Sequence, residues 1–363
     1  MISNFGQFPT WLIPMLLFGG VIHSQPIVTS SDSISIKKEA SVSGLSLSAG
    51  QDAFYPPKNE DRDYTFGIGL GLGGAWVNNK YNPFSWPLKW LHYYPRKLFI
   101  TRGFTDFHYF QTSLKAYTPD LIQADTVVKN DRPYSSIWFF SFGKKSIDKD
   151  EKIFVQSDFR IGILGMHMAR EIQTWFHQTE RSTKGRQEPY DPMGWHNQIS
   201  NGGELTGAYR LTVGFDPTKN LNSNIIQVIP KIELSLGYQT YLGTSAGFRL
   251  GKLHSPWWSF HSNPMEFGNT YYKQDDKWFE VYGFVNGSFR YVFYDALLQG
   301  QFKNSYHTLD ASDVVPLQAW LETGLVFRVG FFETWAALNI TTPSNRLVTR
   351  DHYWMSLTGQ FYF

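Results

Sequence analysis

The sequence of 363 residues contains no cysteine, which excludes disulfide frameworks, thiolate zinc sites and cysteine nucleophiles. It also has no excess of one charge, because 33 Lys and Arg stand against 31 Asp and Glu, a formal net charge of +2. No basic stripe is therefore available to neutralise a phosphate backbone, and we expect no nucleic-acid partner. Beyond the first 24 residues there is no apolar run long enough for a transmembrane helix.

The chain is rich in aromatic residues and glycine, with 30 Phe, 20 Tyr, 13 Trp and 31 Gly. This composition favours membrane-spanning strands over helices. Residues 11–22 form an apolar run that is too short to span comfortably. We predict a signal peptide over 1–24, a polar segment over 25–41 and an outer-membrane β-barrel over 42–363, with an uncleaved N-terminal anchor as the alternative.

Alternation of apolar and polar residues is clearest at the C-terminus, where Met355, Leu357 and Phe361 share one face and Thr358 lies opposite. The chain ends on Phe363, as bacterial outer-membrane barrels do. Similar blocks recur along the whole sequence, and we predict strands over 44–54, 65–73, 98–117, 134–142, 153–166, 204–215, 225–241, 243–252, 279–301, 315–330, 333–342 and 352–363. Their even number predicts a closed, all-β, antiparallel barrel of about twelve strands in the bacterial outer membrane.

Residues 167–178 break the alternation and predict a helix. Ala169, Ile172 and Phe176 recur at helical spacing on one side, and Gln173 and His177 lie on a polar side. The helix follows the fifth predicted strand, so it belongs to a loop, which the topology places outside the cell. Two other sequence patterns resemble functional motifs but lack the structural context. The glycines of 69–74 alternate within one strand and give no nucleotide site. Residues 243–247 match a nucleophile elbow, but no helix follows their serine.

Polar residues gather where the first predicted strand ends and the second begins. Gln51 and Asp52 close the first strand, and Thr65, expected to point into the barrel, opens the second. Both should meet the helix that carries His177 at one rim of the barrel. A histidine near a carboxylate can act as a general base, and carboxylate and amide oxygens suit calcium. The alternative is a set of turn residues and a solvated histidine.

Four ordered motifs resemble the outer-membrane lipid A 3-O-deacylase family. They are Asp61-Arg62-Asp63-Tyr64-Thr65-Phe66-Gly67, Asp131-Arg132-Pro133-Tyr134-Ser135, Glu171-Ile172-Gln173 with His177, and Gly194-Trp195-His196-Asn197-Gln198-Ile199. Their order agrees with the family from about residue 46 to 199, and the barrel pattern extends the likeness to the C-terminus. This resemblance implies a calcium-dependent esterase that removes an acyl chain, of the 3′-acyloxyacyl type, from the lipid A of lipopolysaccharide.

The resemblance also implies roles for single residues. It makes His177 the base that activates water, Asp52 and Gln51 the metal ligands, and Thr65 a residue that holds the site together. Gln51 stands where the family usually has Asn, and a lysine of some members has no clear counterpart between 118 and 127. The residues expected to shape the substrate site are Asp61, Arg62, Tyr64, Asp131, Arg132 and Gln173. A phospholipase-type barrel and a non-catalytic, porin-like or structural barrel stay open as alternatives.

Overall fold

The computed structural model describes residues 37–39, 43–52, 62–74, 77, 85–184, 191–218, 224–260 and 279–363. The predicted signal peptide over 1–24 lies outside these residues. The strands are β1 (Lys37–Glu39), β2 (Gly44–Gln51), β3 (Asp63–Gly73), β4 (Phe104–Thr118), β5 (Ser135–Asp148), β6 (Ile153–Leu164), β7 (Glu204–Phe215), β8 (Ile226–Gly237), β9 (Gln239–Lys252), β10 (Phe279–Asp295), β11 (Leu317–Val329), β12 (Phe332–Thr341) and β13 (His352–Tyr362). The helices are α2 (Ser85–Phe99), α3 (Met168–Lys184) and α4 (Ala296–Gln299), with 3₁₀ turns η4 (Gly194–Asn197) and η6 (Trp257–Ser259). In these ranges no helix combines the length and apolar character needed to cross a membrane.

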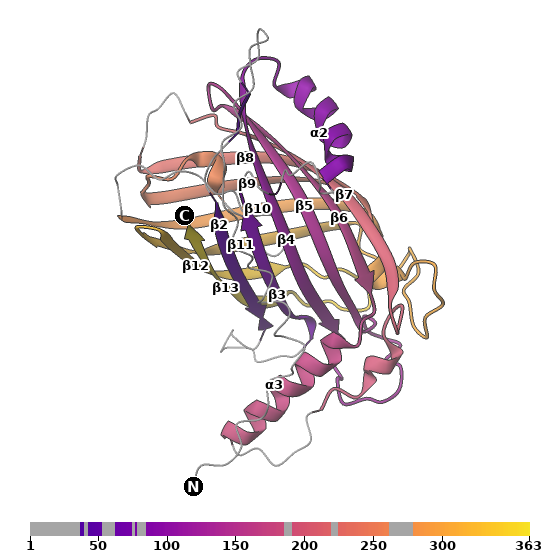
Figure 1. The fold of residues 1–363 in the computed structure, drawn as a ribbon. Coiled ribbons are helices and arrows are strands. Elements are labelled where there is room, and N and C mark those ends of the chain that lie inside the picture. The colour runs from indigo at the N-terminus through magenta and orange to yellow at the C-terminus, as the bar shows by residue number, and fades with distance from the viewer. Residues whose placement is uncertain are drawn as a thin grey trace.

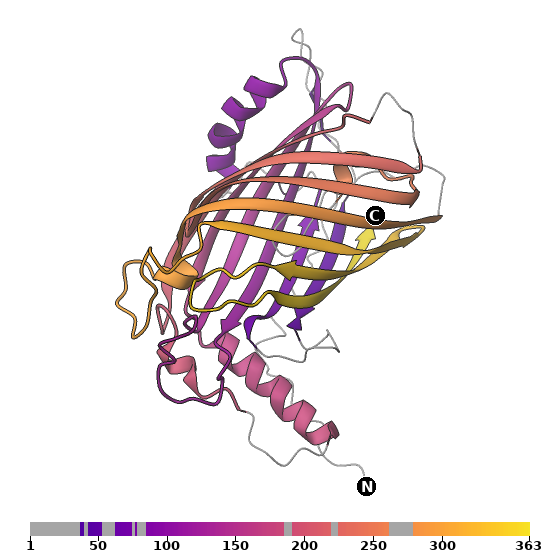
Figure 2. The same ribbon diagram turned by 180° about the vertical axis from the view of Figure 1, so that it is seen from behind.

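Strands β2 to β13 form a closed antiparallel barrel, which Figures 1 and 2 show from opposite sides. Each strand pairs with the next along the chain, and β13 returns to pair with β2. Closure leaves no free edge, so the backbone groups of the wall are paired with one another. The prediction of a twelve-stranded barrel is confirmed. Outside it, β1 adds a short parallel pairing to β4.

The two faces of the wall differ in polarity. On β9, Leu242, Phe248 and Leu250 are exposed, whereas Arg249 between them is fully buried. Strand register carries the outer face around the barrel, because paired residues point to the same side. Exposed Leu47 pairs with Leu70, Leu70 with Thr112, and Thr112 with Phe140. The even-numbered residues of β4 and β5 therefore face outward.

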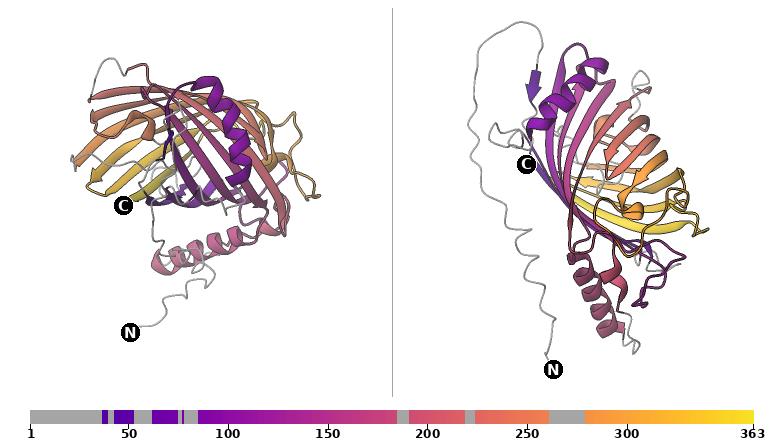
Figure 3. Two further views of the ribbon diagram at one scale, coloured as in Figure 1. Left: turned by 45° about the horizontal axis from the view of Figure 1, so that its top comes forward. Right: turned by 90° about the vertical axis from the view of Figure 1, so that its right-hand side faces the viewer.

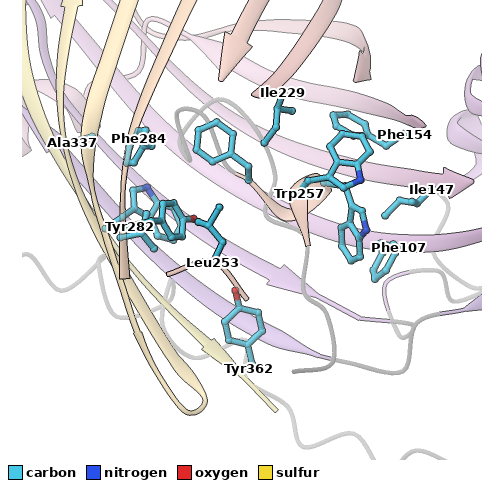
Figure 4. Packing of buried hydrophobic residues seen from close by; sticks show 14 residues of the cluster. Phe107, Ile147, Phe154, Ile229, Leu253, Trp257, Tyr282, Phe284, Ala337 and Tyr362 are labelled. Carbon is cyan, nitrogen blue, oxygen red and sulfur yellow. The ribbon is translucent and has the colours of Figure 1, made fainter. Parts of the chain in front are cut away.

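A segment of the β9–β10 connection fills one end of the lumen. Leu253, Trp257, Trp258 and Phe260 pack among inward-facing side chains of the wall. Figure 4 shows Leu253 and Trp257 in this cluster. We call this segment, Leu253–Phe260, the plug. A Cβ at Gly247 would lie 2.4 Å from the ring of Phe260, so only glycine fits between the wall and the plug. Polar contacts also hold this segment. Lys145 Nζ donates to Trp258 O at 3.0 Å, Arg249 Nη1 to Ser255 Oγ at 2.8 Å, and Ser255 Oγ to Glu280 Oε1 at 2.7 Å.

The structure differs from the predicted elements in a few places. The expected helix over 167–178 is present as α3 and is longer. The sequence does not predict helix α2, and the strand predicted over 98–117 includes the last two residues of this helix, Leu98 and Phe99. Aromatic residues and Pro95 hide its helical pattern, because aromatic side chains and proline both have low helix propensity.

The candidate site on the outer rim beneath helix α3

Helix α3 and the β2–β3 hairpin lie at one end of the barrel, opposite the end where β2 begins and β13 finishes (Figure 1). Helix α2 lies at that second end. Single-chain bacterial barrels carry their longer loops on the extracellular side. The position of α3 in the barrel is therefore consistent with the prediction that this helix lies outside the cell.

The first turns of α3 pack against the outside of the wall. Ala169 and Ile172 belong to a buried cluster with Phe66 and Leu114, which face outward from β3 and β4. The ring of Phe176 lies 6.5 Å from that of Phe66. The apolar stripe read from the sequence is thus the surface that holds the helix on the wall. Any site under α3 therefore lies on the outer face of the wall rather than in the lumen.

Thr65 sits on a β-bulge, and this changes its direction. Tyr64 pairs with Tyr117 and Phe66 with Ala116, which leaves Thr65 as the extra residue. Its hydroxyl lies 2.8 Å from that of Thr118, whose even position in β4 faces outward. The expectation that Thr65 points inward is wrong, because regular alternation fails where one strand carries an additional residue. The bulge brings Thr65 to the same side of the wall as α3.

Asp52 and Gln51 lie beside this bulge. Gln51 pairs with Phe66 on one side and Met355 on the other, so its side chain belongs to the outer face. Asp52 is 1% exposed, and its Oδ2 accepts a hydrogen bond of 3.0 Å from the backbone N–H of Arg62. Phe66 therefore lies beside Gln51, its strand partner, and directly follows Thr65 in the chain. Its ring contacts that of Phe176, the residue before the half-buried His177.

The two Asp-Arg motifs meet at the carboxylate of Asp63. Arg132 Nη1 lies 3.6 Å from Asp63 Oδ1, and Arg62 Nη1 lies 3.9 Å from Asp63 Oδ2. The Arg132 guanidinium also stacks over the ring of Tyr117 at 4.4 Å. Both arginines are buried, so their ion pairs with Asp63 connect the β2–β3 and β4–β5 loops inside the protein and not at an exposed surface. Asp61, a predicted site-shaping residue, lies outside the described residues.

Asp131 organises the loop that carries the second motif. Its Oδ2 accepts from the backbone N–H of Asp120 at 2.8 Å, and its Oδ1 accepts from that of Arg132 at 2.6 Å. Burial raises the pKa of the Asp131 carboxyl above its ordinary value, although these two hydrogen bonds oppose the change. The position of Asp131 makes it a loop-forming residue that fixes where Arg132 stands.

Gln173 connects α3 to the fourth motif. Its Oε1 accepts a hydrogen bond of 2.6 Å from Trp195 Nε1, and both residues are buried. Trp195 packs on Tyr134 with ring centroids 4.9 Å apart. A Cβ at Gly194 would lie 2.5 Å from Tyr134 Cε2, which explains the glycine. The third and fourth motifs therefore act as one structural unit that holds the helix carrying His177.

Tyr64 points to the other side of the wall, where a cavity of about 140 Å³ opens inside the barrel. The acidic, basic and histidine residues that line it are Asp63, Lys115, Arg132, Arg290, Asp295 and His352. The sequence motifs did not identify Lys115, Arg290, Asp295 or His352. Their inward-facing places in strands or at strand ends are the one signal that could have found them.

The donor atoms near the bulge fit a hard cation in kind. Asp52 offers a carboxylate and Gln51 an amide oxygen, and calcium takes such oxygen ligands. Among the described residues there is no group of three or more His, Cys, Asp or Glu that could hold a metal. A dense carboxylate cage is therefore not what this part of the chain offers.

Comparison with known proteins gives matches that extend over most of the chain. A family model described as outer membrane protein LpxR matches residues 16–363. The solved structure of LpxR from Salmonella typhimurium is similar, with a TM-score of 0.67 and 18% identity over 88% of this chain and 100% of that chain. The β domain of the Bordetella autotransporter BrkA is much less similar, with a TM-score of 0.36 and 9% identity over 89% of this chain and 99% of that chain. No curated protein matches the sequence.

Proposed function

Because the chain belongs to the LpxR family of outer-membrane proteins, we propose that it is a lipid A deacylase, an esterase acting on lipopolysaccharide. The observation that carries the proposal is the outward direction of the candidate site. Thr65, Gln51 and the base of α3 all lie on the lipid-facing side of the wall. Lipid A is embedded in the leaflet around the barrel, so its acyl esters can reach such a site by lateral diffusion alone.

Within this proposal, His177 removes a proton from water as the water attacks the ester carbonyl, and then returns it to the leaving alkoxide. The cleaved bond is the one between the carbonyl carbon and the ester oxygen, and the products are a free fatty acid and a lipid A hydroxyl. Asp52 and Gln51 would hold a calcium ion, whose charge would stabilise the oxyanion that forms on the carbonyl oxygen. Thr65 fixes the bulge through Thr118, and Gln173 fixes the helix through Trp195.

The plug argues against the porin-like alternative. Leu253, Trp257, Trp258 and Phe260 occupy the lumen at the end away from α3, together with the inward side chains that they contact. A porin needs a continuous polar lumen. This filled section favours a barrel that serves as a rigid support for a site on its wall.

The phospholipase-type alternative needs an accessible serine beside a histidine. Ser146 and Ser157 lie beside His92, but all three side chains are buried between α2 and the wall. Ser245, in the sequence Gly243–Gly247, is buried in the lumen and has Lys231 and Ser288 as its strand partners. Neither partner is a histidine, so this serine is not arranged as an activated nucleophile. The rim beneath α3 remains the better candidate.

The test is mass spectrometry of lipid A after incubation with the purified protein. We expect a mass loss equal to one acyloxyacyl or acyl chain, dependent on calcium and abolished by chelation. The product should appear with phospholipids present as competitors. Unchanged lipid A at saturating calcium, combined with release of fatty acid from phospholipids, would instead show that the protein is a phospholipase.

A further inference from the structure

Helix α2 covers the outside of the barrel at the end away from α3, as the rotated views of Figure 3 show. Its buried side chains are Leu88 and His92, one helical turn apart, and Ile100 follows directly after the last turn. Ile100 packs with Val155 and Val213, which face outward from β6 and β7. One side of α2 is therefore committed to the wall.

A polar network fixes this side of α2. His92 Nδ1 lies 3.0 Å from Ser157 Oγ, and His92 Nε2 lies 2.8 Å from Ser146 Oγ. Ser146 Oγ donates to Asp106 Oδ1 at 2.6 Å, and Lys144 Nζ pairs with Asp106 Oδ2 at 2.9 Å.

The strand residues of this network face outward, so without α2 they would be exposed to lipid. They are Asp106, Lys144, Ser146 and Ser157. An ion pair and hydroxyl groups on a lipid-facing wall are costly unless they are covered. The network therefore makes α2 a fixed part of the wall and sets which side of the helix turns away from it.

The side that turns away is unusually apolar. Trp86 is 66% exposed, Trp90 71%, Tyr94 64% and Leu98 75%. A protein surrounded by water rarely exposes so many large apolar side chains together. Tryptophan and tyrosine concentrate where a membrane meets water, because their rings are apolar and their N–H or O–H groups are polar.

The same segment is strongly basic. Residues 85–103 contain Lys89, Arg96, Lys97 and Arg102 and no Asp or Glu. The Arg96 guanidinium stacks over the ring of Phe104 at 4.3 Å, so it also helps to hold the helix on the wall. Lys89, Lys97 and Arg102 are exposed. A basic helix with an aromatic side fits a negatively charged membrane surface.

We propose that α2 is a lipid-docking helix, whose exposed aromatic side chains enter the membrane interface and whose Lys89, Lys97 and Arg102 bind the headgroups of anionic phospholipids. The helix lies at the end where β2 begins and β13 finishes, opposite the rim that is proposed to receive lipopolysaccharide. Its partner is accordingly the phospholipid of the other leaflet. Such binding would fix the depth and tilt of the barrel independently of catalysis.

Native mass spectrometry of the full-length protein in detergent micelles tests the proposal. Phosphatidylglycerol and phosphatidylcholine with the same acyl chains are titrated separately, and the bound lipid is counted. We expect phosphatidylglycerol to bind at least tenfold more tightly. The double variant Lys89→Gln/Lys97→Gln should lose about 30-fold in affinity for phosphatidylglycerol and little for phosphatidylcholine. Trp86→Ser/Trp90→Ser should weaken the binding of both lipids.

The control is Lys252→Gln, which removes an exposed charge at the last residue of β9, at the same end of the barrel but three strands from β6, whereas α2 packs against β5 and β6. It should bind phosphatidylglycerol as the wild type does. All three variants should keep the heat-dependent gel mobility of a folded barrel, because each changes exposed side chains. Equal affinity for the two lipids, or equal losses in the α2 variant and the control, would overturn the proposal. So would tighter, Lys89-dependent binding of lipopolysaccharide at this helix.

Discussion

Replacing His177 by alanine should stop ester cleavage and leave the barrel folded. The residue is half-buried on α3, and its removal keeps Ala169, Ile172 and Phe176, which attach the helix to the wall. The hydrogen bond between Gln173 and Trp195 also stays. We therefore expect a stability cost of at most about 1 kcal/mol, within the range for substitutions away from a core.

The effect on rate should be much larger than the effect on stability. Loss of a general base typically lowers the rate by about 10²–10⁴, which corresponds to about 3–5 kcal/mol of transition-state stabilisation. The assay is the lipid A mass profile at fixed time points, together with gel mobility with and without heating. Because the barrel stays folded, an inactive variant with unchanged mobility assigns the loss to chemistry.

His196→Ala is the matched control for His177→Ala. His196 lies on η4, in the same long β6–β7 connection, and its Nδ1 is 3.5 Å from Asp125 Oδ1 at an exposed position. Its truncation should leave the rate within about twofold, because an exposed ion pair contributes little. Wild-type turnover by His177→Ala, or equal losses in both variants, would refute the assignment of the base and the use of the family resemblance at that residue.

Three further results are expected from the same structure. Asp52→Ala should abolish turnover in the low-calcium assay and recover part of it in excess calcium, whereas His177→Ala should show no rescue. Gly194→Ala should lower both the unfolding temperature and the rate, since its Cβ would lie 2.5 Å from Tyr134 Cε2; thermal melts and the lipid A assay measure the two. A cysteine placed at the exposed Gln178 should react with an impermeant maleimide on intact cells, and labelling only after lysis would contradict the predicted topology.

The barrel itself could be predicted because each strand alternates apolar and polar residues and the wall is closed. Every one of the twelve predicted blocks overlaps one of the strands β2 to β13. The helix over 167–178 was also recognisable, since its apolar positions recur at helical spacing and the structure uses them for packing on Phe66 and Leu114.

Other features depend on contacts between distant parts of the chain, which one sequence does not reveal. The bulge at Thr65 is an example, because the extra residue becomes apparent only from the pairing of Tyr64 and Phe66 with β4. The plug at Trp257 follows a strand in sequence but is defined by the wall around it. Helix α2 is hidden for a related reason: its exposed side resembles a strand facing lipid, as both are rich in aromatic residues.

The outward turn of Thr65 has a consequence for how substrate would reach the site. A residue directed into the lumen would require lipid A to leave the membrane and enter a barrel that already contains Asp63, Lys115 and Arg290 at that end. Extracting acyl chains from the bilayer costs about 0.8 kcal/mol per methylene, which is prohibitive for several long chains. The proposed site on the outer wall beneath α3 would avoid this cost, because the chains would stay in lipid while the ester approached His177. In the proposed mechanism, the bulge is therefore the structural feature that would let this fold hydrolyse an ester whose chains remain in the membrane.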